Sequence, residues 1–451
     1  MFAIIALIFS GQSIYMGLTI PVFQAPDEDS HALYVSHVIN KSLFTVQKDG
    51  DPLLLEGMEG FQPPLYYWGA ALWASAFGAD FSNLSFDYEP FSTYKPDRGE
   101  KFPYGAGFRG LHVVRLFSTL LGIVVLLFAY KTAIVFWEDE GKALLVPSLM
   151  VVHPQYVFHS SVITNDALAC AIGAIYLFSL SRYLKTERNN DLYLMFILAG
   201  LGLLTKISMV VFYPVSILAV AAIRRDRKIV LRKVVSGTAV YLLVTAIFII
   251  RNIYIYGDPL AYSEMMKVAV EKMGARSDSE SSAGYLIFSM LPQTFRTFWG
   301  VFGWTTIHLP ERIYFIYLLF TIFGLSGLLF KRESLDTSFR RNLRAFSAMI
   351  MVLLFISLLR WNLHVAASQA RLLFPAITAF YILFADGLTA RGKFFIYLRN
   401  TYFIFAIFIS TYWLFLVLPG TYARFTWSDE TIRTVFPLLG KLSGVYRIFG
   451  L

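Results

Sequence analysis

Three carboxylates and an imidazole meet in residues 25–31 (Ala-Pro-Asp-Glu-Asp-Ser-His), directly after a hydrophobic run. On a helix that begins at Pro26, Asp27 and His31 are four residues apart and share one face. A carboxylate held where the chain leaves a membrane is well placed to act as a general base. Acidic residues in a first helical turn also simply stabilise the helix start, so both interpretations stay open. Asp27 and Asp29 form an Asp-x-Asp pattern that could hold a divalent cation, and the sequence leaves the metal unknown.

A second polar group lies in residues 162–168 (Val-Ile-Thr-Asn-Asp-Ala-Leu), at the start of a later hydrophobic run. Thr164 or Asn165 fits the N-cap of a helix and Asp166 fits its first turn, which explains the pattern by structure alone. The orientation argued below places Asp166 on the same side of the membrane as Asp27. A functional role for Asp166 is therefore an equally open interpretation.

Basic residues stand at the ends of several hydrophobic runs, namely Arg115, Lys206, Arg251, Arg360 and Arg371. Side chains that reach out to lipid headgroups account for most such positions. Lys206 (in Leu-Thr-Lys) and Arg371 (in Ser-Gln-Ala-Arg) follow turns that can direct them into the helix bundle. Arg115 and Arg360 have less reason to point inward. A phosphate group at the membrane surface would need partners such as Lys206 and Arg371.

The composition is that of an integral membrane protein. Apolar residues make up 57% of the 451 residues and charged residues 15%, against about 25% charged in soluble domains. The net charge of +9 arises largely in short loops between hydrophobic runs, where retention on the cytoplasmic side explains it better than a nucleic-acid partner does. Cys170 is the single cysteine, which excludes an internal disulfide and a cysteine-based metal site.

The hydrophobic runs predict an all-α polytopic protein with about eleven transmembrane helices. The region between Asp191 and Ile223 is longer than one straight span needs, so we expect two short spans that turn near Lys206. The predicted spans are residues 1–22, 111–136, 143–158, 167–184, 191–207, 208–223, 234–252, 311–330, 344–360, 372–390 and 394–418.

The orientation follows from five short basic loops, which hold nearly half of the 39 Lys and Arg residues. These loops all fall on one side of the predicted topology, and that side should be cytoplasmic. The N-terminus is then inside, and the C-terminal tail and the polar groups described above are outside. The first hydrophobic run lacks a basic segment before it and has Pro26 after the small residue Ala25, so we expect a retained span and not a cleaved signal peptide.

Two outer segments, residues 23–110 and 253–310, are too long to be simple connections. The first contains Gln-Pro-Pro-Leu-Tyr-Tyr-Trp at residues 62–68, which leads into an apolar stretch that ends at Phe77 and is too short to span a membrane. Proline at its start and the aromatic residues predict an interfacial helix. We expect a second interfacial helix over Leu286–Phe302.

These motifs, in this order, resemble those of the polytopic glycosyltransferases of the C fold class (GT-C), which include protein O-mannosyltransferases and the aminoarabinose transferase of lipid A. The resemblance covers most of residues 26–375, and the phrases between residues 251 and 304 are similar to an uncharacterised bacterial and archaeal branch. Many members carry a soluble outer domain, whereas here we expect a catalytic module over residues 1–418 and a short outer tail over 419–451. The matching phrases are Asp27-Glu28 with His31, Gln62–Tyr67, Asn165-Asp166, Leu203–Lys206, Arg251-Asn252, Tyr256–Pro259, Phe298–Trp304 and Gln369–Pro375.

The resemblance implies an inverting transferase in the cell membrane that takes a sugar from a polyprenyl-phosphate carrier on the extracytoplasmic face. The acceptor would be a lipid, a glycan or a protein. By the same resemblance, Asp27 is the catalytic base and Glu28 its neighbour or an acceptor contact. The donor would be bound by Asn165, Asp166, Lys206 and Arg371, and the acceptor by His31, Gln62 and Tyr66.

Two other classes share much of this pattern. A transporter or lipid flippase would line a path with buried charges, and such proteins often show repeated halves with broken helices at the membrane midplane. The sequence shows no internal repeat and gathers its charges at one surface, which favours the enzyme. A polymerase or ligase of lipid-linked glycans would share the topology and stays open.

Overall fold

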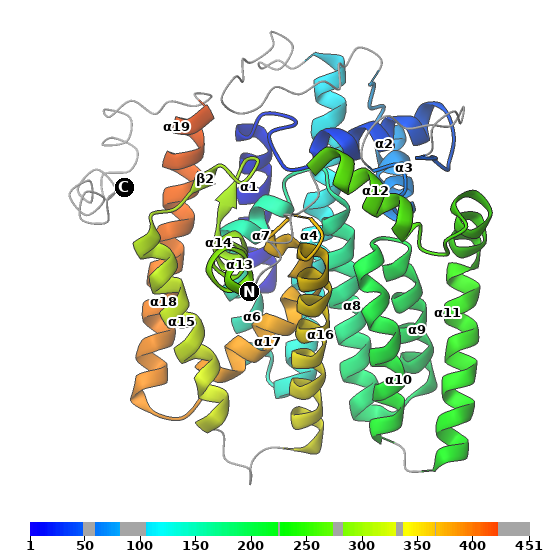
Figure 1. The fold of residues 1–451 in the computed structure, drawn as a ribbon. Helices are drawn as coiled ribbons and strands as arrows, with labels where there is room; N and C mark the ends of the chain where they lie inside the picture. The colour runs from blue at the N-terminus through cyan, green and yellow to red at the C-terminus, as the bar shows by residue number, and fades with distance from the viewer. Residues whose placement is uncertain are drawn as a thin grey trace.

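The computed structural model describes residues 1–47, 59–81, 105–223, 226–273, 283–330, 337–365 and 367–422. Within these ranges the chain is a helical bundle with one two-stranded hairpin (Figure 1). The polytopic all-α class predicted from the sequence is confirmed. Most of the predicted tail, residues 423–451, lies outside the described residues.

Eight helical segments of the described chain are long and apolar enough to cross a membrane. They are α1 (Phe2–Thr19), α4 (Ala106–Trp137), α8 (Asn165–Thr186), α11 (Arg227–Tyr256), α15 with η4 (Glu311–Ser326, Gly327–Phe330), α16 (Ser338–Asn362), η6 with α17 (Ala370–Ala376, Ile377–Leu388) and α18 with η7 (Lys393–Tyr412, Trp413–Val417). Helices α4 and α8 run in the same direction, because the short helices between them return the chain to the end where α4 begins (Figure 1).

The region predicted as two short spans does turn where expected. Helix α9 (Asn189–Leu203) ends before Lys206, whose backbone is extended, and η2 (Ile207–Val211) with α10 (Phe212–Ile223) leads back. The prediction of one span over 143–158 is wrong. The chain there forms three short helices, α5 (Glu140–Ala143), α6 (Leu145–Val151) and α7 (Pro154–His159). A proline cannot donate to the preceding turn, which is why the chain restarts at Pro154. The count of eleven spans is accordingly not confirmed.

The two long segments lie at one end of the bundle. In the first, α2 (Glu28–Asn40) and the predicted helix α3 (Leu65–Ala76) pack together (Figure 1). The second contains α12 (Tyr262–Met273), α13 (Ala283–Tyr285), η3 (Leu286–Met290) and α14 (Leu291–Trp299). The helix predicted over 286–302 stops at Trp299, because β1 (Val301–Phe302) and β2 (Ile307–His308) form a hairpin beyond it. Helix α19 (Leu418–Tyr422) closes the described chain.

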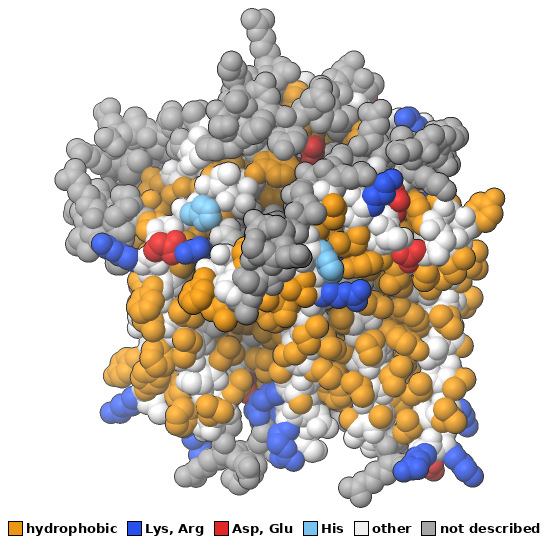
Figure 2. Space-filling model, viewed as in Figure 1, with side chains coloured by type: hydrophobic (Ala, Val, Ile, Leu, Met, Phe, Trp, Pro, Cys, Tyr) orange, Lys and Arg blue, Asp and Glu red, His pale blue; other side chains and the backbone are white. Residues whose placement is uncertain are grey.

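The opposite end of the bundle carries the basic loops. Figure 2 shows Lys and Arg gathered there below a broad hydrophobic belt. Arg344 of α16 turns inward at this end and binds the buried carboxylate of Asp386 at 2.8 Å. The basic loops and the two long segments thus occupy opposite ends of the molecule.

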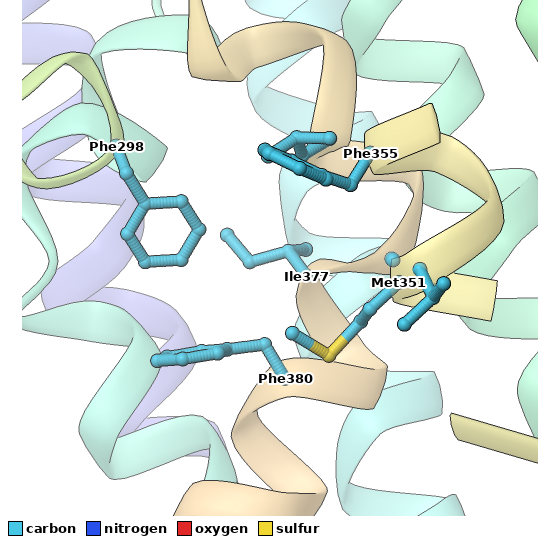
Figure 3. A pocket seen from close by; sticks show the side chains of 8 residues that line it. Phe298, Met351, Phe355, Ile377 and Phe380 are labelled. Carbon is cyan, nitrogen blue, oxygen red and sulfur yellow. The ribbon is translucent and has the colours of Figure 1, made fainter. Parts of the chain in front are cut away.

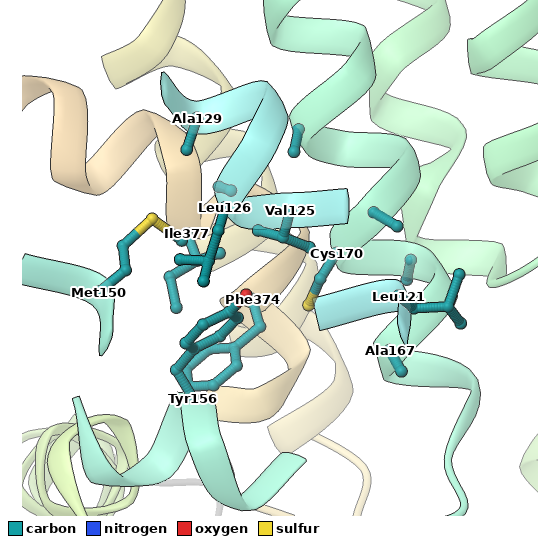
Figure 4. Close-up of a cluster of buried hydrophobic side chains, with 14 of the residues drawn as sticks. Leu121, Val125, Leu126, Ala129, Met150, Tyr156, Ala167, Cys170, Phe374 and Ile377 are labelled. Carbon is teal, nitrogen blue, oxygen red and sulfur yellow. The ribbon is translucent and has the colours of Figure 1, made fainter. Parts of the chain in front are cut away.

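The core between α4, α8 and η6 sets the position of the polar groups. Side chains of Leu121, Val125, Tyr156, Cys170 and Phe374 pack together there (Figure 4). Helix α8 approaches η6 so closely that a Cβ at Gly173 would lie 2.0 Å from the carbonyl oxygen of Pro375. This close crossing brings the start of α8 beside the start of η6.

Candidate functional site

Asp27 occupies the N-cap position of α2, with a left-handed backbone (φ 62°, ψ 10°). A non-glycine residue pays a conformational cost in this region, so the surrounding contacts must hold it there. The contacts come from Arg371 at the start of η6. Its guanidinium forms an ion pair with the Asp27 carboxylate and donates to the carbonyl of Pro26 at 3.2 Å.

Arg371 also links Asp27 to a second ion pair. Its Nε lies 3.9 Å from Oδ2 of Asp166, and Lys206 binds Oδ1 of the same carboxylate. Asp166 stands in the first turn of α8, where Thr164 is the N-cap and donates its hydroxyl to Oδ2 at 3.3 Å. Asp27, Arg371, Asp166 and Lys206, which we call the charged cluster, therefore come from four distant segments. The structure brings together these four residues that the sequence singled out.

The charged cluster lies at the end of the bundle that carries the two long segments. Its members stand at the end of α9, at the starts of α8 and η6, and directly after α1, all opposite the basic loops. The Asp27 side chain is 22% exposed and that of Asp166 is 1% exposed. Asp27 is thus the more accessible carboxylate of the charged cluster.

The cations of the charged cluster keep Asp27 ionised. Burial raises the pKa of this carboxyl, but the charges of the neighbouring cations, that of Arg371 first, and the Arg371 hydrogen bond outweigh burial and bring the pKa below its ordinary value. An ionised carboxylate can accept a proton at neutral pH.

His31 lies one turn along α2 from Asp27, as the spacing predicted. Its Nδ1 is 2.8 Å from the hydroxyl of Tyr67, whose ring stacks on Tyr34 with centroids 3.7 Å apart. Burial lowers the pKa of His31 to about 4, with the nearby cations adding to the effect and the carboxylates opposing it. The imidazole is therefore neutral at physiological pH and serves as a hydrogen-bonding group.

Glu28 is fully buried, and both of its carboxylate oxygens accept hydrogen bonds from other groups of the protein. It forms a bidentate pair with Arg115 (2.8 Å and 2.6 Å) and accepts the backbone N–H groups of Phe23 and Ile163. Arg115 also donates to three backbone carbonyls at the end of α1. The expectation that Arg115 points to lipid headgroups is wrong, since the residue is 2% exposed. Glu28 joins α1, α4 and the start of α8, and this geometry gives it a positioning role in place of the predicted catalytic or acceptor contact.

Replacing Glu28 by Gln should lower thermal stability more than it lowers the rate of the chemical step. An amide nitrogen facing Arg115 cannot accept its hydrogen bonds, and a buried unsatisfied group costs about 1–3 kcal/mol. Thermal unfolding in detergent measures the effect. An unchanged melting temperature would contradict the positioning role.

The Gln-Pro-Pro-Leu-Tyr-Tyr element holds the site from the other side. Tyr66 is fully buried, and its hydroxyl lies 3.3 Å from that of Ser118 and accepts the N–H of Thr164 at 3.1 Å. The backbone N–H of Leu65 donates to the carbonyl of Leu204, two residues before Lys206. The Tyr66 side chain has no accessible surface and fixes the starts of α3 and α8, and its predicted acceptor contact stays a prediction. Gln62 lies beside it, with its carbonyl 3.5 Å from the Tyr34 hydroxyl.

Other residues singled out from the sequence lie outside the charged cluster. Asn165 is 2% exposed, and its amide nitrogen has no hydrogen-bond partner. Arg251 binds the carbonyl of Thr45, and the Arg360 guanidinium lies 5.1 Å from the ring centroid of Tyr262. Two buried groups near the charged cluster, Glu59 and His159, were missed by the sequence analysis. Their only signal was a polar residue type within largely apolar surroundings.

The Asp-x-Asp pattern does not gather further metal ligands. Among the residues that the structure describes, no group of three or more His, Cys, Asp or Glu side chains could hold a metal ion. The Asp27 carboxylate is engaged by Arg371. The possible divalent cation therefore remains a prediction from sequence.

Comparison with solved structures places this fold among known proteins. The chain is similar to ArnT from Cupriavidus metallidurans bound to undecaprenyl phosphate, with a TM-score of 0.53 and 13% identity over 94% of this chain and 73% of that one. It is also similar to the oligosaccharyltransferase of Archaeoglobus fulgidus, with a TM-score of 0.50 and 15% identity over 94% of this chain and 56% of that one. These likenesses confirm the predicted resemblance to the GT-C class at the level of the fold.

A family match agrees with this class. Residues 106–252 match the family described as dolichyl-phosphate-mannose-protein mannosyltransferase. The protein O-mannosyltransferase Pmt1-Pmt2 complex of S. cerevisiae is matched with a TM-score of 0.39 and 16% identity over 62% of this chain. The chain spans only 35% of that protein and 56% of the archaeal one. A comparison with curated proteins finds no significant match.

Proposed function

We propose that this protein is a membrane glycosyltransferase that transfers a sugar from a polyprenyl-phosphate carrier to a hydroxyl-bearing acceptor. The observation that carries the proposal is the charged cluster, in which two carboxylates and two cations meet at one end of a GT-C bundle. The carboxylates can serve proton transfer and sugar binding, and the cations can serve a phosphate leaving group. The fold and the matched family support the same assignment.

In the proposed reaction, Asp27 accepts the proton of the acceptor hydroxyl as its oxygen attacks the anomeric carbon. The new C–O bond forms while the bond from the anomeric carbon to the phosphate oxygen breaks, and the lipid phosphate leaves with the bonding electrons. Attack opposite the leaving group inverts the anomeric centre. Lys206 and Arg371 balance the negative charge that develops on the phosphate.

Binding of the donor phosphate at the proposed site would also change the pKa of Asp27. Arg371 is bonded to Asp27 in the structure. A donor phosphate placed between Arg371 and Lys206 competes with Asp27 for the guanidinium. Loss of a cationic partner raises the pKa of a carboxyl group, which makes Asp27 a stronger base only when the donor is bound.

An apolar pocket along η6 and α17, whose lining in η6 begins two residues after Arg371, suits the lipid chain of such a donor. The pocket has a volume of about 240 Å³ and lies between α14, α16 and η6 with α17 (Figure 3). Val352 on its rim is 55% exposed, so the pocket opens on the outer face of α16, and Leu373 follows Arg371 by two residues. All eight lining residues are apolar: Phe298, Met351, Val352, Phe355, Leu373, Ala376, Ile377 and Phe380.

The experiment that tests the proposal is transfer of a radiolabelled sugar from a polyprenyl-phosphate donor by the protein in reconstituted vesicles. Acceptor classes (lipid, glycan and protein) are offered separately. Labelled acceptor is the expected product. Movement of intact donor to the other leaflet without a labelled acceptor would instead identify a flippase, and growth of a lipid-linked chain would identify a polymerase or ligase.

The proposed active site faces the extracytoplasmic side, because the basic loops lie at the other end of the bundle. Cysteines introduced at Asn40 and Asn190, both exposed, should react with a membrane-impermeant maleimide from opposite sides. We expect Asn40→Cys to label in intact cells and Asn190→Cys only after permeabilisation. The native Cys170 is buried and provides the background. The reverse pattern would place the site in the cytoplasm.

A further inference from the structure

Glu59 sits in a turn that the protein holds firmly in place. Its carbonyl accepts the N–H of Gln62 at 3.0 Å. The carbonyl of the next residue, Gly60, accepts a hydrogen bond from the Thr45 hydroxyl at 2.8 Å, and the Gly60 N–H donates to the side-chain oxygen of Gln47 at 3.0 Å. The Glu59 backbone is thus fixed between the Gln-Pro-Pro element and the chain that follows α2.

The carboxyl group of Glu59 is buried without a full set of partners. The residue is 7% exposed, and Oε2 has no hydrogen-bond partner. The charged groups that act on it are Asp27, Arg371 and Lys206 of the charged cluster. Its other ionisable neighbours are the phenols of Tyr34 and Tyr67. A buried carboxyl oxygen left unpaired is energetically unfavourable, so this group is better satisfied when a ligand fills the site.

Glu59 carries its proton at neutral pH. Burial raises its pKa to about 8, and the negative charge of Asp27 adds to this effect. Arg371, Lys206 and a hydrogen bond from the Gln62 side chain act in the opposite direction, but the two cations are themselves paired with Asp27 and Asp166. A protonated carboxyl group offers an O–H donor, whereas an ionised one offers only acceptors.

We propose that Glu59 is a further donor-binding residue, which donates a hydrogen bond from its neutral carboxyl group to a phosphate oxygen of the lipid-linked donor. This inference rests on the proposed function for the class of ligand. Asp27 and Asp166 already balance the two cations, so an ionised Glu59 would repel an incoming phosphate. A neutral Glu59 adds a donor beside Lys206 and Arg371 without adding charge.

The test measures binding of undecaprenyl phosphate to the reconstituted protein between pH 6 and pH 9, by ligand-induced change in intrinsic fluorescence. Since only the protonated form binds well, affinity of the wild-type protein should fall about tenfold between pH 7 and pH 9. Glu59→Gln keeps a donor of the same size, so its affinity should equal the wild-type value at pH 7 and stay flat to pH 9. Glu59→Ala should bind about three- to tenfold more weakly at pH 7.

The control is Glu140→Gln, an exposed residue at the opposite end of the bundle, which should reproduce the wild-type profile. The ionisation of the ligand itself is common to all variants and cancels in the comparison. A wild-type profile without an alkaline loss overturns the role of Glu59, and so does a Glu59→Gln protein that binds as weakly as Glu59→Ala. Failure of the wild-type protein to bind undecaprenyl phosphate at any pH would instead overturn the proposed donor class.

Discussion

Replacing Asp27 by Asn should reduce sugar transfer by about 10²–10⁴-fold, the usual contribution of a general base. The amide has the same size but cannot accept the acceptor's proton. Asn tolerates the left-handed backbone that this position requires (φ 62°). We therefore expect expression and thermal stability to stay close to wild type while the rate of transfer collapses.

The transfer assay in vesicles, combined with a measurement of undecaprenyl-phosphate binding, distinguishes a loss of catalytic rate from a loss of donor binding. If Asp27 is the base, the variant binds the lipid phosphate at least as tightly as the wild-type protein, because Asp27 no longer competes for Arg371, and it loses the rate. Glu311→Gln provides a carboxylate control, because its pair with Arg296 lies at the surface and such pairs contribute little. Full activity of Asp27→Asn would mean that this carboxylate only starts a helix.

Much of the site could be predicted because each of its four charged residues carries a local signal. Asp27 and Asp166 open helices directly after or at the start of apolar runs, and Lys206 and Arg371 interrupt such runs at turns. Each local pattern also fits a simple structural explanation. The order of the motifs along the chain made the functional interpretation specific, and the structure then placed the four residues in contact.

What the sequence could not provide were pairings between distant segments. Arg115 stands in a long apolar run, and nothing near it in the chain indicates that Glu28, 87 residues away, meets it in the interior. The same holds for Tyr66, whose partner Thr164 is 98 residues away. Glu59 carried no local signal beyond its polar residue type. Such contacts depend on how the helices cross, for example at Gly173, and helix crossings are not encoded within any one segment.

The predicted span over residues 143–158 is divided into short helices, and the contacts that these helices make also join distant segments. Hydrophobicity alone predicts one span there, but Pro147 and Pro154 interrupt it. The short helices place His153 against the carbonyl of Phe298 at 2.6 Å and Gln155 against the N–H of Val301 at 2.7 Å. Buried polar groups of this kind are tolerated because they are paired across segments. The second long segment is thereby tied to the bundle beside the charged cluster.

Removing either cation of the charged cluster should impair use of the donor by about 2–4 kcal/mol, the loss typical of one strong contact to a developing negative charge. We expect this of both Lys206→Ala and Arg371→Ala. The phosphate must be met in a site where water is scarce, and charge-assisted contacts supply the stabilisation there. Arg371→Lys should restore activity only in part, because a point charge cannot bind Asp27 and a phosphate with the geometry of a guanidinium fork.

The alanine substitutions of the two cations should have different effects on the rate profile. Among the described residues, the Lys206 side chain forms an ion pair with Asp166 alone, whereas Arg371 contacts both Asp27 and Asp166. Lys206→Ala should therefore weaken lipid-phosphate binding and kcat/KM and raise the pKa of Asp27 less than Arg371→Ala does, because Arg371 acts on this carboxyl more strongly than Lys206. Arg371→Ala should raise the pKa of Asp27 more, which shifts the acid limb of the rate profile further to higher pH. Arg296→Ala, at a surface pair on the same end of the bundle, is the matched control. Wild-type transfer rates in both alanine variants would mean that these cations serve structure alone and that the phosphate binds elsewhere.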